Sequence, residues 1–322
     1  MNLSELASVA GVSVSTVSKA LKNAPDIGDA TKERIWQLAK EYGCYGKYYS
    51  SRFNKKVIAI ILPEFAGNHY ANIVGMLERL IYDSGAVAVC ATDKFEKGRQ
   101  TELIDYFISH IKVDGLFVFH LKEPLKKGYK NVPIVSFITA EDKAVDKVNV
   151  DMKAAMGEWV KYLYELGHRK IAFLGEGLTK GKGDNFLEAM KKYKGTCPYI
   201  FESSQRFEAA GEENAELLLS DAPECTALIC AYDNIAYGAI KRLKEKGYSI
   251  PQDYSVIGCN NLSFSEYTDI PLASVDLNDD EVAKSAWELM QKKLDNTYYQ
   301  ALKPVVIHGS LVIKASIAPP RK

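Results

Sequence analysis

Hydrophobic residues recur along this chain with two different spacings, and the change comes near residue 56. Before that point, apolar residues return every three or four positions in short blocks, as on one face of an amphipathic helix. After it, short apolar runs alternate with longer amphipathic segments, which is typical of buried parallel strands separated by helices. The pattern therefore predicts a small helical module followed by a larger α/β core.

The helical module is expected to contain three helices. Asn2 can cap a helix over Leu3–Ala10, and Gly11 can end that helix in a tight turn. Ser13 can cap a second helix over Val14–Leu21, and a third, over about 29–42, would close a small core. Two short helices around a glycine turn form a helix-turn-helix, although the same geometry fits any three-helix packing unit.

The outward face of the second predicted helix favours DNA binding over simple packing. Its exposed residues are Val14, Ser15, Thr16, Ser18 and Lys19. Small hydroxyl side chains allow close approach to phosphates, and a long cation can reach the edge of a guanine.

The larger part of the chain shows two successive series of strands. They are expected at Val57–Leu62, Ala86–Ala91, Gly115–Phe119 and Ile134–Phe137, and then at Lys170–Leu174, Pro198–Phe201, Ala227–Cys230 and Tyr254–Gly258. Two similar α/β series in tandem predict two lobes around a cleft. Ligands in such folds bind at the carboxyl ends of the strands.

Length and charge agree with a multidomain binding protein. The 322 residues are too many for one ordinary domain. The net charge is zero, but residues 1–56 contain nine Lys or Arg against five Asp or Glu, so the remainder is acidic by the same excess. A basic module suits phosphate binding, although ordinary solvated helices can give the same balance.

Several other classes of protein are not expected. The six cysteines are scattered among apolar neighbours without a CxxC pair, which predicts reduced, mostly buried thiols and neither a metal site nor a cofactor. No signal-type segment or apolar run of about 18 residues occurs, so we expect a cytoplasmic protein without membrane contact. Gly175–Gly183 fails the Walker spacing, and no GxSxG elbow is present, so no enzyme is expected.

Residues 6–21, LASVAGVSVSTVSKAL, resemble the head of the lactose-repressor (LacI/GalR) family, whose pattern runs VAxxAGVSxxTVSRxLN. The resemblance implies a set of DNA contacts: bases for Val14, Ser15 and Lys19, phosphates for Thr16 and Ser18, and the DNA backbone for Asn2. Lys19 replaces the usual arginine, so a two-point grip on guanine becomes a single-point contact.

The segment that follows, residues 43–53, resembles the hinge of the same family, with the pattern YxPNxxARxL. In that family the hinge forms a helix on operator DNA and wedges an apolar side chain into the minor groove, a position that Phe53 occupies here. Gly46, Lys47 and the Ser50-Ser51 pair depart from the pattern and lower helix propensity, so we expect ordering mainly on DNA. A plain flexible linker fits the same residues.

The resemblance extends over nearly the whole chain through motifs at Val113–Gly115, Leu166–Ile171, Ala236–Ala239 and Ile250–Gly258. It implies an N-terminal all-α helix-turn-helix head plus an α/β two-lobed core like that of periplasmic binding proteins. The expected bounds are 1–45 for the head, 46–56 for the hinge and 57–322 for the core. Lobe 1 would take about 57–149 and 278–304, and lobe 2 about 150–277 and 305–322. His168, in one motif, is expected to be structural.

The same resemblance implies where an effector binds and what the protein does. The effector-binding positions are Asn68, His69, Tyr70, Lys182 (for the family's Arg), Asp233 and Asn260 (for its usual Asp). A sugar or another polar neutral molecule is expected; Lys182 also suits a phosphorylated or carboxylated ligand, or is a plain exposed loop lysine. The implied function is a transcription regulator, commonly a repressor, that binds a palindromic operator as a homodimer or tetramer.

Overall fold

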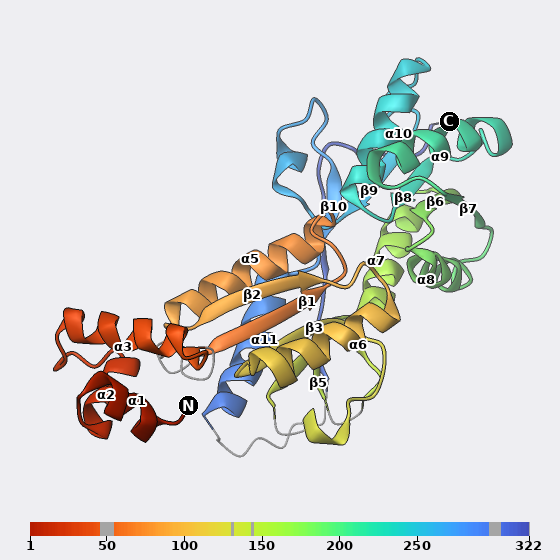
Figure 1. Ribbon diagram of the computed structural model, residues 1–322. Helices are drawn as coiled ribbons and strands as arrows, with labels where there is room; N and C mark the ends of the chain where they lie inside the picture. The colour runs from red at the N-terminus through yellow and green to blue at the C-terminus, as the bar shows by residue number, and fades with distance from the viewer. Residues whose placement is uncertain (46–54, 130–131, 143–144, 296–303, 322) are drawn as a thin grey trace. The chain divides into compact units, whose positions relative to one another are not determined.

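Figure 1 shows the computed structural model, which describes residues 1–45, 55–129, 132–142, 145–295 and 304–321. The chain forms two compact units, residues 1–57 with 85–87 and residues 58–84 with 88–322. Phe53, with most of the expected hinge, lies outside the described residues. None of the described helices is long and apolar enough to cross a membrane.

The head contains three helices, α1 (Leu3–Ala10), α2 (Val14–Leu21) and α3 (Asp29–Glu41). The first two have the predicted bounds because their capping residues act locally. The Asn2 side chain accepts a hydrogen bond from the Glu5 N–H at 2.9 Å, and the Glu5 carboxylate accepts from the Asn2 N–H. Ser13 Oγ accepts from the Thr16 N–H at 3.0 Å. The head core is apolar and includes Leu6, Ala10, Val17, Leu21, Ile35 and Trp36.

The first lobe is built on a six-stranded sheet in the order β11-β5-β4-β3-β1-β2. Its strands are β1 (Val57–Leu62), β2 (Val87–Thr92), β3 (Gly115–Leu121), β4 (Ile134–Ala140), β5 (Asp146–Val150) and β11 (Val305–Ile307). Its helices are α5 (Asn68–Asp83), α6 (Lys97–Asp105), which continues as a π-helical turn (Tyr106–Ile111), and α11 (Asp279–Leu294). Within this sheet β1 pairs with β3, β3 with β4, β4 with β5, and β5 with β11, all in parallel, as the buried apolar runs predict.

The second lobe repeats this plan with the strand order β12-β10-β9-β8-β6-β7. Its strands are β6 (Lys170–Glu176), β7 (Cys197–Ser203), β8 (Ala227–Cys230), β9 (Ser255–Cys259), β10 (Ala273–Asp276) and β12 (Ser310–Val312). Its helices are α7 (Met152–Glu165), α8 (Lys180–Met190), α9 (Phe207–Asp221) and α10 (Asp233–Glu245). The edge strand β12 runs antiparallel to β10, whereas the strands from β7 to β10 pair in parallel.

The chain passes between the lobes three times. It leaves the first sheet after β5, returns to α11 after β10, and crosses back between β11 and β12. Because β11 pairs with β5, residues 305–307 belong to the first lobe, and the last crossing comes a few residues later than the expected position near 305. The periodicity does not indicate β11, because three residues are too few to set a pattern.

In the second lobe, α9 and α10 approach each other with their backbones in contact. A Cβ atom on Gly211 would lie 2.0 Å from the Ile235 carbonyl oxygen, and one on Gly238 would lie 1.9 Å from the Glu208 carbonyl oxygen. Only glycine fits at these two positions. The contact fixes the N-terminal ends of both helices relative to each other, and those ends carry residues of the site described next.

Candidate DNA-binding surface and effector cleft

The outer face of α2 presents the side chains predicted to contact DNA. Ser15 and Lys19 are exposed, Thr16 and Ser18 are half-buried, and the Val14 residue is 44% exposed although it is apolar. The opposite face of the helix is buried in the head core. The face is therefore available for contact, while Asn2 at the start of α1 uses its side chain to cap that helix.

One ion pair on this face was not expected from the sequence. Lys19 Nζ lies 2.5 Å from Asp26 Oδ2, and both side chains are about half exposed. The hydrogen bond from Lys19 lowers the pKa of Asp26 below its ordinary value. The cation assigned to base contact is thus held by a carboxylate of its own head.

A cavity of about 690 Å³ lies between the two lobes of the core. It is lined by residues that follow β1, β3, β6, β7, β8 and β9, at the carboxyl ends of the strands. Five of the six predicted effector positions line it: Asn68, His69, Tyr70, Lys182 and Asn260. Three of them begin α5, and the other two come from the second lobe.

Asp233 corrects the sixth expectation, because it does not line the cavity. It is fully buried, and its carboxylate accepts hydrogen bonds from the Leu262 N–H at 2.7 Å and from Ser274 Oγ at 2.5 Å. This burial raises the pKa of Asp233 to about 6. Adjacent helical positions point in different directions, so the next residue, Asn234, faces the cavity instead.

Arg206 is the main cleft residue that the sequence analysis missed. It precedes α9 in the second lobe and binds Glu64, which follows β1 in the first lobe, with Nη2–Oε1 at 2.7 Å and Nη1–Oε2 at 3.2 Å. Its Nε also donates to the buried Glu176 at 2.7 Å. These carboxylates raise the pKa of the Arg206 guanidinium. No local motif signals a pair so far apart in the sequence.

A second contact crosses the cavity beside this ion pair. Asn68 Nδ2 in the first lobe donates to Asn234 Oδ1 in the second at 3.1 Å. We refer to the Glu64–Arg206 and Asn68–Asn234 contacts together as the cross-cleft contacts. They join the two lobes directly across the cavity.

Aromatic rings form much of the cavity wall. Tyr70 packs edge-on against Phe119, with ring centroids 5.3 Å apart, and its hydroxyl lies 3.3 Å from His120 Nε2. Burial raises the pKa of Tyr70 to about 12 and lowers that of His120 to about 4, so both are neutral at pH 7. Rings next to polar groups are suited to stacking on the apolar face of a sugar-like molecule.

Lys182 and Phe207 show how the second lobe shapes its wall. Lys182 Nζ donates to the Ala231 carbonyl at 2.7 Å and lies 4.5 Å from the centre of the Tyr232 ring. Both of these partners are uncharged groups. Phe207 has a φ of 53°, which is strained for a bulky residue. Its N–H donates to Glu176 at 2.9 Å, which holds the strained conformation and turns the chain at the cavity edge.

Two other predicted residues contact the frame of the cavity. His69 Nδ1 lies 2.8 Å from Asp279 Oδ1 at the start of α11, which joins two helices of the first lobe. The Asn260 backbone has a φ of 105°, and its N–H donates to the Val275 carbonyl at 2.9 Å.

His168 has the structural role expected, with Nδ1 2.8 Å from Thr226 Oγ1 and Nε2 2.9 Å from the Ala318 carbonyl oxygen.

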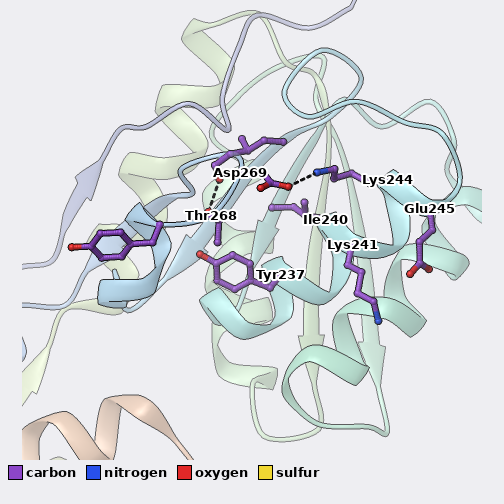
Figure 2. Close-up of a pocket in the computed structure, with 9 residues that line it drawn as sticks. Tyr237, Ile240, Lys241, Lys244, Glu245, Thr268 and Asp269 are labelled. Carbon is purple, nitrogen blue, oxygen red and sulfur yellow. Dashed lines mark hydrogen bonds and ion pairs between the residues drawn. The ribbon is translucent and has the colours of Figure 1, made fainter.

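Figure 2 shows another concavity on the second lobe, of about 480 Å³, between α10 and the loop at 267–270. The Lys244–Asp269 ion pair, at 3.2 Å, closes one side of it. Tyr267, which also lines this concavity, is 88% exposed as a residue. This concavity lies along the side of α10 and not at the carboxyl ends of the strands, so the inter-lobe cavity is the better effector site.

The cysteines agree with the expectation of free, mostly buried thiols. Cys44, Cys225, Cys230 and Cys259 are buried and free, whereas Cys90 and Cys197 are exposed. Both exposed thiols lie on strands at a sheet edge, β2 and β7. Apolar neighbours in the sequence therefore did not guarantee burial at a sheet edge.

Comparisons with known proteins match both parts of the chain. Residues 2–45 match the model for bacterial regulatory proteins of the lacI family, and residues 160–317 match that for a periplasmic binding protein-like domain. The HTH-type transcriptional repressor CytR of Escherichia coli (strain K12) is 24% identical over 314 residues, which cover 92% of this chain and 90% of that protein.

Solved structures show the same fold. A Lacl family regulator from Silicibacter pomeroyi superposes with a TM-score of 0.77 at 21% identity over 99% of both chains. The lac repressor dimer bound to operator and the anti-inducer ONPF superposes with a TM-score of 0.74 at 18% identity, also over 99% of both chains. The expected fold, a helix-turn-helix head with a two-lobed α/β core, is thereby confirmed.

Proposed function

This chain belongs to the lacI family of bacterial regulatory proteins, and from that premise we propose that it represses transcription under the control of a small molecule. The head binds operator DNA, and the cavity between the lobes binds the effector. The protein acts in the cytoplasm, where it reaches the chromosome, and acts by binding and not by catalysis. The observation that carries the proposal is the exposed face of α2 within a head that matches this family.

The DNA contacts follow from the positions on α2. Val14, Ser15 and Lys19 are the residues that read bases, and Thr16 and Ser18 contact phosphates. A lysine recognises guanine through its single ammonium group, whereas an arginine can form two parallel hydrogen bonds with the same base. Asn2 contacts the DNA backbone near the start of α1, and Phe53 is the hinge wedge.

The effector is a polar, hydroxyl-bearing molecule such as a sugar or sugar phosphate. The cavity offers aromatic walls at Tyr70 and Tyr232, amide groups at Asn68 and Asn234, and the Lys182 cation. This mixture of rings and a few polar groups is typical of small-molecule sites. Asp233 supports the site from behind, because its carboxylate ties α10 to the loop after β9.

The active form is a dimer. A helix-turn-helix protein with two-fold symmetry places its two recognition helices on the two halves of a palindromic operator. The lac repressor structure, which is a dimer bound to operator, is consistent with this arrangement. Effector binding changes the closure of the two lobes and so shifts operator affinity, by at most its differential affinity for the two states.

The test combines operator selection with a ligand screen. Full-length protein is incubated with a random duplex library, and bound DNA is sequenced; a palindromic site should be enriched, and gel filtration should show a dimer. A thermal-shift screen of sugars and sugar phosphates should then find a ligand that changes the affinity for that site. A monomer with no enriched sequence would contradict the proposal.

A further inference from the structure

The Lys19–Asp26 ion pair is held in place by the backbone around it. The Ala24 N–H donates to the Lys19 carbonyl at 3.0 Å, and the Ile27 N–H donates to the Ala24 carbonyl at 3.3 Å. Ile27 packs against the head core. Asp26 therefore sits on a short turn anchored on both sides, and its carboxylate faces the last turn of α2, where Lys19 lies.

Charge elsewhere in the head does not compensate for this pairing. Residues 1–45 contain five Lys or Arg and five Asp or Glu, so the head is neutral without the segment that follows. Lys32 pairs with Asp29 at 3.3 Å, and Arg34 donates to the Ala10 carbonyl at 3.0 Å. The cation on the outer face of α2 is thus neutralised in a head that carries no net charge to attract phosphates.

We propose that Asp26 determines the DNA specificity of the head by competing with DNA for the Lys19 ammonium group. The inference rests on the proposed DNA-binding function. On random DNA, a phosphate must displace the Asp26 carboxylate from Lys19, and the carboxylate itself repels the DNA backbone. At a matching guanine, the O6 and N7 acceptors lie at the position that α2 presents to the groove, so the exchange of partners is favourable. Asp26 therefore weakens binding to random DNA more than binding to the operator.

The experiment compares Asp26→Asn with Asp29→Asn in the full-length protein. Both variants remove one carboxylate that pairs with a lysine of the head, so the change in total charge is matched. Affinities are measured for the selected operator and for a random duplex of the same length over a range of salt concentrations. Asp26→Asn should tighten random-DNA binding more than operator binding, so that the ratio of the two affinities falls about two- to fivefold, the range expected for one exposed ion pair.

Salt dependence gives a second readout. A freed Lys19 that contacts a phosphate should steepen the slope of log affinity against log salt on random DNA by about one. Asp29→Asn should leave the affinity ratio at its wild-type value. In a Lys19→Ala background, Asp26→Asn should no longer change the affinity ratio or the salt slope, because the ammonium group for which Asp26 and DNA compete is absent.

Two results would overturn the inference while leaving the proposed function intact: equal effects of Asp26→Asn and Asp29→Asn on the affinity ratio, or a loss of specificity from Asp26→Asn that persists without Lys19. A wild-type protein that prefers no sequence would instead overturn the proposed function, and the inference with it.

Discussion

The substitution Glu64→Gln should make the two lobes separate more readily, because it weakens the ion pair that joins them. The glutamine keeps the size of the side chain but loses its charge and one of the two acceptor positions for Arg206. The Glu64 side chain is only 14% exposed, so its interaction is less screened than that of a surface pair. Hydrogen bonds to charged groups contribute about 1.5–3 kcal/mol. Since one neutral hydrogen bond can remain and Arg206 keeps Glu176, we expect a loss of about 1–2 kcal/mol.

Such a loss makes opening about 5- to 30-fold more frequent, since 1.4 kcal/mol is a factor of ten. Hydrogen–deuterium exchange followed by mass spectrometry can measure this change. Amides of peptides covering residues 203–210 should exchange faster, because Arg206 and Phe207 line the cavity and separation of the lobes exposes this segment to solvent.

Glu123→Gln is the matched control, because Glu123 belongs to the same lobe and forms an exposed ion pair with Lys97 at 3.0 Å that does not cross the cavity. It should leave exchange at residues 203–210 unchanged. If Glu64→Gln also leaves those amides unchanged, or slows their exchange, then the ion pair does not hold the lobes together.

Three further outcomes are expected. Lys19→Ala should relax the preference at one base pair of the operator, with a cost of about 1–3 kcal/mol, and equal losses on operator and random DNA would assign Lys19 to a phosphate instead. Gly238→Ala should lower the free energy of unfolding by about 1–3 kcal/mol or more in denaturant titrations, because the new Cβ would meet the Glu208 carbonyl; an unchanged unfolding midpoint would contradict the backbone contact. The pKa of Asp233 is raised from 3.8 to about 6 in the folded state, so ionisation of this carboxyl destabilises the fold increasingly as the pH rises from about 4 to 6. Compared with Asp233→Asn, the wild type should therefore gain free energy of unfolding as the pH is lowered from 7 to 5. Parallel pH profiles of the two proteins would refute this.

The sequence predicted the head and the strand series because their signals are local. Asn2 and Ser13 cap the helices that immediately follow them. A short continuous apolar run such as Val57–Leu62 has the length of a buried strand and is too short for a typical helix. The cleft was predicted less completely. The prediction chose Asp233, which is buried against the loop after β9, although the residue that faces the cavity is the next one in the helix, Asn234.

The remaining cleft chemistry has no local signal at all. Glu64 and Arg206 lie in loops of different lobes, 142 positions apart, and neither loop has a motif that marks it. The same holds for Lys19 and Asp26, because an exposed acid seven positions from a lysine is ordinary in any sequence. Only the folded backbone brings these charges together.

The glycine contact between α9 and α10 determines how the cleft can open. Arg206 precedes α9, and Asn234 lies in the first turn of α10, so both residues that reach across to the first lobe sit on one pair of helices locked backbone to backbone. Neither side chain can be withdrawn by moving its helix alone. When the lobes separate as rigid bodies, the second lobe therefore carries Arg206 and Asn234 away from the first lobe together, and both cross-cleft contacts are lost in the same movement.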